Sequence, residues 1–264
     1  MIDYLLYNKK DRLFGLSYLA TWRDTMKIHH LLSYTRRAIQ DYQMIESGDR
    51  IAIGISAGKD SLALLVALSY LQKFYPKSFE LEAVTVSLGF DNFDLTPIQN
   101  FCKTLGIRYT ICETQIAEIV FDTRQESNPC SLCAKMRKKV LYDKAIELGC
   151  NKIALGHNKD DINETLLMSL FYEGRIHTMS PVLPIDEFNL SLIRPLIYIS
   201  EKDIRYFAKK EQLPVIKSPC PADGHTSREA TKQWLLQLEK HIPQLNANVF
   251  GAISRSSIEG WNNP

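Results

Sequence analysis

The sequence predicts an α/β fold, in which a doubly wound parallel sheet of about five strands has the order 3-2-1-4-5 and carries an N-terminal helix and C-terminal helices. Two observations predict this fold. Short apolar runs alternate with longer helical patterns along most of the chain, as in βαβ units. One of these runs also leads directly into a glycine-containing loop that opens a helix, at residues 50–75.

Five apolar runs are expected to be strands, because they are short, aliphatic and bounded by turn residues. They are residues 50–55, 81–88, 108–112, 152–156 and 190–194. The helices expected between them are residues 61–75, 96–105, 131–148 and 161–172. A glycine or proline follows each of these helices, as is typical of helix ends. Sheets of this kind bind ligands beyond the carboxyl ends of their strands, where the strand order reverses.

The chain is expected to divide into three parts. Residues 1–25 lack clean periodicity and form an N-terminal extension, residues 26–225 form the α/β domain, and residues 226–264 form a C-terminal helical segment. The first regular helix begins soon after Met26 and runs to about Ile45.

Charge and composition limit the function classes. The chain has 32 basic and 30 acidic residues, a net charge of +2, so any nucleic-acid-binding surface has to be local. The longest apolar stretch, residues 62–71, is too short to cross a membrane, and no signal-peptide cleavage site follows the N-terminus. We therefore expect a cytoplasmic protein with no membrane partner. Six cysteines in 264 residues do not indicate a disulfide scaffold.

The first candidate site is the loop Ser56-Ala57-Gly58-Lys59-Asp60-Ser61, between an expected strand and an expected helix. Helix N-termini expose unpaired N–H groups and the positive end of the helix dipole, which attract phosphate. Gly58 permits close backbone approach, the serine hydroxyls add donors, and Lys59 adds a mobile charge. The loop fits neither a Walker A loop nor a dinucleotide-binding loop. The alternative is an ordinary turn capped by Asp60 or Ser61.

A second loop, Gly156-His157-Asn158-Lys159-Asp160-Asp161, follows the fourth expected strand. Strands one and four are neighbours in the predicted order, so the two loops are expected to flank one pocket. Paired carboxylates there can hold Mg²⁺ on nucleotide phosphates or assist proton transfer. The alternative is that Asp160 or Asp161 only caps the next helix and that His157 is an ordinary turn residue.

Three cysteines form the third candidate site. Cys130 and Cys133 open an expected helix, where the thiolate form is favoured, and Cys220 lies in a proline-rich loop. Three interpretations remain open: a redox pair, a structural zinc site completed by Cys220 and His225, or an iron–sulfur cluster held by three cysteines. The other three cysteines, Cys102, Cys112 and Cys150, are expected to be core residues.

These motifs, in this order, resemble one family. The first loop resembles the Ser-Gly-Gly-x-Asp-Ser loop of the PP-loop ATP pyrophosphatases, with Ala57 in place of a glycine. The region from about residue 30 to residue 235 is similar to the tRNA 2-thiocytidine synthetases. The matching motifs are Cys130-Ser131-Leu132-Cys133, Ala154-Leu155-Gly156-His157, Asp160-Asp161, Glu164-Thr165, Phe171-Tyr172, Ile193-Arg194-Pro195-Leu196, Glu201-Lys202-Asp203-Ile204 and Cys220.

The resemblance implies an ATP-dependent tRNA thiolase, which adenylylates the C2 carbonyl of a pyrimidine and replaces the oxygen with sulfur. It implies ATP and Mg²⁺ as cofactors, with Asp60 and Asp161 at the metal or the reacting centre. The nucleotide-binding residues it implies are Ser56, Ala57, Gly58, Lys59, Asp60, Ser61, Gly156 and His157.

The same resemblance implies a 4Fe-4S cluster with one open iron that passes sulfur to the activated carbon. Its ligands in this chain are Cys130, Cys133 and Cys220, and the first two count among the catalytic residues. The implied partners are tRNA, a sulfur donor (a cysteine desulfurase or inorganic sulfide) and a second copy of the chain, paired through the N-terminal helix. One departure is Asn158, where the family usually has a second histidine.

Two other functions fit the same residues. One is a PP-loop ligase or thiolase acting on a small metabolite, because the chain is only weakly basic. The other is a non-catalytic nucleotide-binding module with structural zinc. Basic groups on three expected helices are each typical of a solvated helix face. They are Arg36 with Arg37, Lys135 with Arg137, Lys138 and Lys139, and Lys202 with Arg205, Lys209 and Lys210.

Overall fold

A computed structural model describes residues 22–90, 93–124, 129–222, 224 and 226–261. Residues 1–21 of the expected N-terminal extension therefore lie outside the described residues. Helix α1 spans Trp22–Asp41, so the last four residues of that expected extension are helical and the helix begins earlier than predicted. None of the helices in the described ranges is long and apolar enough to span a membrane.

The sheet confirms the predicted order and adds one strand. Its order is β3-β2-β1-β4-β6-β5. The strands are β1 (Asp49–Gly54), β2 (Phe79–Ser87), β3 (Arg108–Glu113), β4 (Lys152–Ala154), β5 (Val182–Ile185) and β6 (Leu190–Ile193). The five expected strands are β1 to β4 and β6, and all four pairings among them are parallel.

The prediction of about five strands was one short, because it missed the edge strand β5. This strand pairs antiparallel with β6 through a short hairpin that includes the 3₁₀ turn Asp186–Phe188 and Asn189 in a left-handed conformation. Pro184 lies within β5. A proline and only four residues weaken a strand pattern in sequence, and proline is tolerated where a strand has a free edge.

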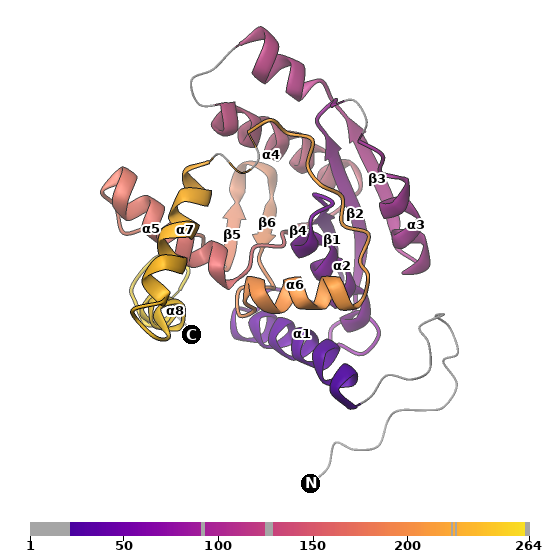
Figure 1. Cartoon of the computed structure of the whole chain (residues 1–264). Coiled ribbons are helices and arrows are strands. Elements are labelled where there is room, and N and C mark those ends of the chain that lie inside the picture. Colours follow the sequence, from indigo (N-terminus) through magenta and orange to yellow (C-terminus); the bar gives the residue numbers. More distant parts are fainter. Residues whose placement is uncertain (1–21, 91–92, 125–128, 223, 225, 262–264) are drawn as a thin grey trace.

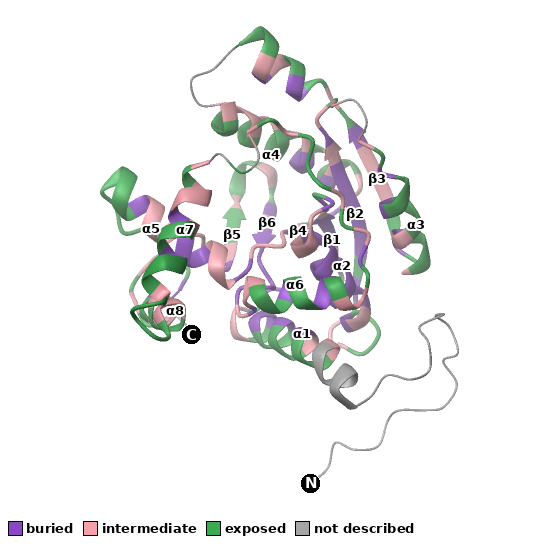
Figure 2. Cartoon of the chain, in the orientation of Figure 1, coloured by how far each residue is buried: buried purple, intermediate pink, exposed green. Residues whose placement is uncertain are grey.

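The described ranges contain eight α-helices. After α1 they are α2 (Lys59–Leu71), α3 (Thr96–Thr104), α4 (Pro129–Glu147), α5 (Lys159–Glu173), α6 (Glu201–Lys210), α7 (Ser227–Glu239) and α8 (Leu245–Ser254). Helices α1, α2 and α6 pack together on one face, and α4 packs on the other (Figure 1). Helices α5, α7 and α8 pack on one another. The central strands β1 and β2 are mostly buried, whereas the edge strands β3 and β5 are largely intermediate or exposed (Figure 2). Helix α2 is almost entirely buried.

Residues of the C-terminal helical segment, Ile253 and Trp261, lie in the main apolar core cluster. Trp261 is completely buried, and its indole N–H donates to the Met179 carbonyl at 3.1 Å. Its ring packs edge-on against Tyr42 and Phe250. The described part of the chain therefore folds around shared apolar clusters, and α7 and α8 are held at fixed positions beside α5.

We predict that Trp261→Ala destabilises the protein by about 3–5 kcal/mol, because it removes a fully buried indole and leaves a cavity. Trp234→Ala is the matched control, since Trp234 is 43% exposed, and should cost less than about 1 kcal/mol. Urea denaturation followed by circular dichroism measures both. Equal losses in the two variants would show that the C-terminal residues are not part of the folded core.

Candidate functional site

The first candidate loop, residues 56–61 and here called the phosphate loop, joins β1 to α2, as predicted. Gly58 occupies the N-cap position of α2, and no side-chain cap is formed there. The loop is closed by hydroxyl groups: Ser61 Oγ donates to the Gly58 carbonyl at 2.9 Å and accepts from the Ser56 backbone N–H at 3.2 Å. The alternative of a turn capped by Asp60 or Ser61 is therefore not what the structure shows, and the first N–H groups of α2 are left for an anion.

Ala57 adopts a left-handed backbone conformation with φ of 62°. The family pattern has glycine here, and the positive φ explains why, since this conformation costs other residues about 1–2 kcal/mol. The Ala57 side chain is completely buried. The backbone carbonyl of Ala57 accepts from the Ile216 N–H at 3.0 Å. Packing and this hydrogen bond hold the loop in a strained shape.

The two loops touch through their backbones. A Cβ atom placed on Gly156 would lie 2.8 Å from the Asp60 carbonyl carbon and 2.9 Å from the Ser61 nitrogen. No side chain fits in that space, so the residue has to be glycine. The Asn158 amide then donates to Asp60 Oδ1 at 3.0 Å. These contacts confirm that the two loops are neighbours, and a shared nucleotide pocket stays a prediction.

Asn158 is the N-cap of α5, and Asp161 completes a capping box with it. The Asn158 side chain accepts from the N–H groups of Asp160 and Asp161, and Asp161 Oδ2 accepts from the Asn158 N–H at 2.9 Å. The capping interpretation of Asp161 therefore holds for one of its oxygens. The departure at Asn158 is compatible with an intact site, because this side chain joins the two loops.

Lysine and glutamate side chains form a network over the phosphate loop. Lys59 Nζ lies 2.9 Å from Asp60 Oδ2 and 2.9 Å from Glu201 Oε1, and Lys232 Nζ lies 2.8 Å from Glu201 Oε2. Burial alone would raise the pKa of Glu201, but hydrogen bonds from Lys232 and Lys59 outweigh it and lower the pKa to about 2. Asp160 accepts from the Glu201 N–H at 2.7 Å, which ties α6 to the second loop.

Arg228, at the start of α7, faces the acidic part of the site. Its Nη1 lies 3.3 Å from Asp161 Oδ1 and 3.7 Å from Glu164 Oε2, and its Nη2 donates to Thr165 Oγ1 at 3.2 Å. Burial raises the pKa of Asp161, and burial together with the Asp161 charge raises the pKa of Glu164 to about 7. Arg228 faces both carboxyl groups, but its charge does not offset the effect of burial on their pKa values.

His157 lies between Gly156 and Asn158 but contacts a different residue. Its Nδ1 accepts from Arg194 Nε at 3.2 Å. Arg194 is buried at the end of β6, and its Nη1 donates to the Ser180 carbonyl. Burial, followed by the charges of Arg194 and Arg228, lowers the pKa of His157 to about 3. The imidazole is therefore neutral at physiological pH.

The three candidate cysteines come from two segments of the chain. Cys130 and Cys133 lie at the start of α4, and Cys220 lies in the segment between α6 and α7. Cys130 is exposed, and Cys133 and Cys220 are half-buried. Burial raises the pKa of Cys133, and the nearby thiols of Cys220 and Cys130 raise it further. The segment between α6 and α7, which carries Cys220, passes over the phosphate loop and reaches the start of α4 (Figure 1). The other three cysteines are buried in the core, as predicted.

The described residues include no group of three His, Cys, Asp or Glu side chains that could hold a metal ion. Zinc thiolates in a tetrahedral site need sulfur atoms about 4 Å apart. The cluster held by three cysteines therefore stays a prediction. His225, named as a fourth zinc ligand, lies outside the described residues.

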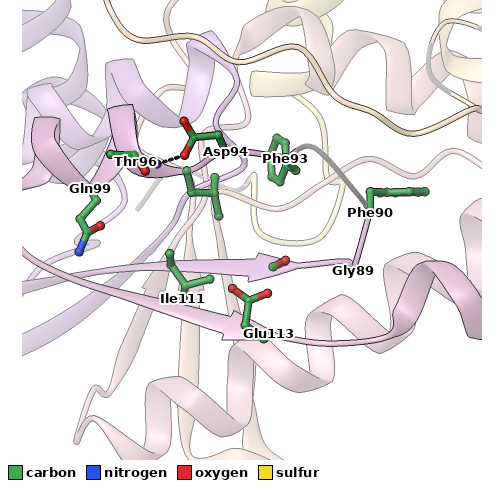
Figure 3. Close-up of a pocket in the computed structure, with 10 residues that line it drawn as sticks. Gly89, Phe90, Phe93, Asp94, Thr96, Gln99, Ile111 and Glu113 are labelled. Carbon is green, nitrogen blue, oxygen red and sulfur yellow. Dashed lines mark hydrogen bonds between the residues drawn. The ribbon is translucent and has the colours of Figure 1, made fainter.

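A separate cavity of about 430 Å³ lies at the carboxyl ends of β2 and β3 (Figure 3). Polar groups line it, among them Asp94, Thr96, Gln99 and Glu113, and Asp94 accepts from the Thr96 N–H at 2.9 Å. The sequence analysis named none of its residues. It shares the carboxyl edge of the sheet with the phosphate loop, because Ser87 of β2 lines it and β2 pairs with β1.

Sequence reasoning gave no role to four charged residues of the site, Arg194, Glu201, Arg228 and Lys232. Two of them lie in motifs that matched the family, and the other two follow the capping residue Thr226 at the start of α7. Nothing in the spacing indicated that α7 folds back over the two loops. The basic residues Lys135, Arg137, Lys138 and Lys139 are exposed on α4, the helix that Cys130 and Cys133 open.

Comparison with known proteins agrees with this geometry. A family model described as a PP-loop domain matches residues 27–239. The tRNA-cytidine(32) 2-sulfurtransferase of Syntrophotalea carbinolica is 40% identical over 222 residues, 83% of this chain and 86% of that protein. The protein of the same name from Geobacter sulfurreducens is 36% identical over 233 residues, 87% of this chain and 91% of that protein.

One solved structure is also similar. The U34-tRNA thiolase NcsA from Methanococcus maripaludis, solved with its 4Fe-4S cluster, superposes with a TM-score of 0.69. It is 25% identical in sequence, and the match covers 85% of this chain and 78% of that one.

We predict that Ala57→Gly changes stability by less than about 1 kcal/mol, because relief of backbone strain offsets the loss of a buried methyl group and the greater freedom of the unfolded chain. Ala57→Val should cost about 2–3 kcal/mol, since a β-branched residue is strained at this φ and overfills the site. Urea denaturation measures both. A large loss in Ala57→Gly would mean that methyl packing outweighs the strain.

We predict that Glu201→Gln lowers stability at neutral pH by at most about 3 kcal/mol. The folded-state pKa of Glu201 lies below its ordinary value of 4.5, so this contribution is present above about pH 4.5 and is lost as the pH falls toward about 2. The gap between wild type and variant, measured by denaturation at several pH values, should close over that range. Glu80→Gln is the control, since Glu80 is 74% exposed; a gap that stays constant with pH would contradict the prediction.

Proposed function

This chain belongs to the PP-loop family and, within it, to the tRNA 2-thiocytidine synthetases, and we propose that it thiolates a pyrimidine of tRNA in an ATP-dependent reaction. The relatives named tRNA-cytidine(32) 2-sulfurtransferase support a cytidine as the target. The C2 carbonyl oxygen is a poor leaving group. Adenylylation converts it into part of AMP, which a sulfur nucleophile can then displace.

The nucleotide half of the proposal rests on the two adjoining loops. The N-terminus of α2 and Lys59 would bind phosphates of ATP, for which Lys59 would leave its two carboxylate partners. Asp161, with Asp60, would hold Mg²⁺ on these phosphates, and Mg²⁺ needs only one or two protein carboxylates when phosphates supply the other ligands. Arg228 lies beside Asp161 and would neutralise charge that develops on the departing pyrophosphate.

The sulfur half rests on the meeting of the three cysteines, and this observation carries the proposal. Cys130 and Cys133 lie 87 or more positions before Cys220 in the sequence, yet the Cys130 and Cys220 thiols act on the pKa of Cys133. They would hold a 4Fe-4S cluster whose fourth iron is open to sulfur. A neighbouring structure that contains such a cluster supports this assignment.

The partners follow from the reaction. The tRNA would bind across the exposed basic residues of α4, which lie on the same helix as Cys130 and Cys133. The target pyrimidine has to leave its stack to reach the activated phosphate. The sulfur would come from a cysteine desulfurase or inorganic sulfide in the cytoplasm, and two copies of the chain would pair through α1.

Two results would favour the other functions. Binding of tRNA that does not weaken with salt would point to a small metabolite as substrate, because phosphate contacts release counterions. Zinc without iron would point to a nucleotide-binding module.

We predict that anaerobically purified protein contains iron and acid-labile sulfide at about four per chain, as a 4Fe-4S cluster requires. Cys130→Ala, Cys133→Ala and Cys220→Ala should each lose most of both, and should lose tRNA thiolation while keeping ATP binding. Cys150→Ala is the matched control, because Cys150 is buried in the core, and it should keep its iron. Iron-free protein with stoichiometric zinc, or a cluster indifferent to Cys220, would contradict the proposal.

A further inference from the structure

The hydrogen bond between Arg194 and His157 fixes where the imidazole carries its proton. An arginine Nε–H can only donate, and the guanidinium keeps its proton in proteins. His157 Nδ1, 3.2 Å from Arg194 Nε, must therefore accept. A neutral imidazole has one N–H, so the proton is on Nε2. The residue is held as a hydrogen-bond donor through Nε2 and is not a base at that atom.

Arg194 is itself rigidly placed. It ends β6, its backbone N–H donates to the Pro181 carbonyl at 3.0 Å, and its Nη1 donates to the Ser180 carbonyl. Only 6% of the residue is exposed. In the described ranges no salt bridge is formed to Arg194, so nothing neutralises its charge. A buried cation without a counter-ion is costly, which argues for a functional reason to keep it.

The side chain of His157 faces a different part of the site from its neighbours. Gly156 and Asn158 both contact the phosphate loop at Asp60. His157, between them, contacts Arg194 of the adjacent strand instead. The residue as a whole is half-buried. Its Nδ1 is occupied by Arg194, so Nε2 is the ring nitrogen that remains for a ligand.

We propose that His157 donates a neutral hydrogen bond from Nε2 to the oxygen that joins the activated substrate carbon to the α-phosphate, and that Arg194 is the positioning residue that fixes this donor. The proposal rests on the proposed function. Sulfur at the oxidation level of hydrosulfide forms the C–S bond and loses its proton to solvent. The C–O bond breaks, and its electron pair stays on the oxygen that departs with AMP.

The charges that face His157 suit this role. Arg194 approaches from β6 and Arg228 from α7, and both disfavour a charged imidazole. Tyr142 of α4 interacts with Arg194. The ring therefore stays neutral while negative charge builds up on the departing oxygen, and a fixed donor stabilises that charge without giving up its proton.

The first test is nitrogen-15 NMR of histidine-labelled protein, with the His157 signals assigned by their loss in His157→Gln. We expect a proton on Nε2, none on Nδ1, and no titration between about pH 5 and pH 9. In Arg194→Met the ring should populate both tautomers and titrate near the ordinary value of about 6.5. Arg194→Lys, which keeps a donor and folds more safely, should retain the Nε2–H form. A proton on Nδ1 in the wild type, or no change in Arg194→Met, would overturn the assignment.

The second test separates the two chemical steps. In His157→Ala, at saturating ATP, thiolated nucleoside should form about 100-fold more slowly, as when one oxyanion donor is removed, while tRNA-dependent pyrophosphate release falls far less. His177→Ala, an exposed histidine on a loop, is the control. Equal loss of both steps, or of neither, would overturn the role of His157. Wild-type protein that thiolates no tRNA would instead defeat the proposed function, and the NMR result would still decide the tautomer.

Discussion

The backbone contact between Gly156 and the Asp60–Ser61 peptide is the constraint on which the site depends. A side chain at residue 156 would meet backbone atoms at 2.8 and 2.9 Å, and backbone atoms at the start of a helix cannot move aside as a flexible side chain can. The contact brings the ends of β1 and β4 together where the strand order reverses. Asn158 then reaches Asp60, and Asp161 is placed beside the same loop by the capping box of α5.

Ion pairs between basic side chains and the carboxylates of the site also hold its elements together. Carboxylates from α2, α5 and α6 gather at one edge of the sheet, and their mutual repulsion has to be offset. Lys59 does part of this, but Arg228 and Lys232 come from α7. The C-terminal helices are therefore part of the site, and the burial of Trp261 stabilises the position that α7 needs. In the proposed complex, nucleotide phosphates would take the place of carboxylates as partners of the basic side chains, and Mg²⁺ would take the place of basic side chains as a partner of the carboxylates.

The segment between α6 and α7 links the nucleotide loop to the cysteines. Ile216 lies four residues before Cys220, and its N–H donates to the Ala57 carbonyl. The strained Ala57 and the third cysteine thus belong to one continuous stretch of contacts.

The sequence by itself predicted five strands, the helices between them and the two loops. These features are local, because each strand, glycine turn and helix cap is specified by residues within a few positions of one another. The sequence also showed an alanine where the family pattern has glycine, and Ala57 has the positive φ that favours glycine. The strand β5 escaped prediction because four residues with a proline carry little periodicity.

Only the tertiary structure decided which charged residues complete the site. Arg194, Arg228 and Lys232 contact residues 37, 67 and 31 positions away, and no local pattern encodes such pairs. It also gave Asn158 its role as a link between loops, and it set the tautomer of His157 through one arginine on the neighbouring strand. Packing of distant elements fixes these contacts, since burial and direction of side chains are properties of the whole fold.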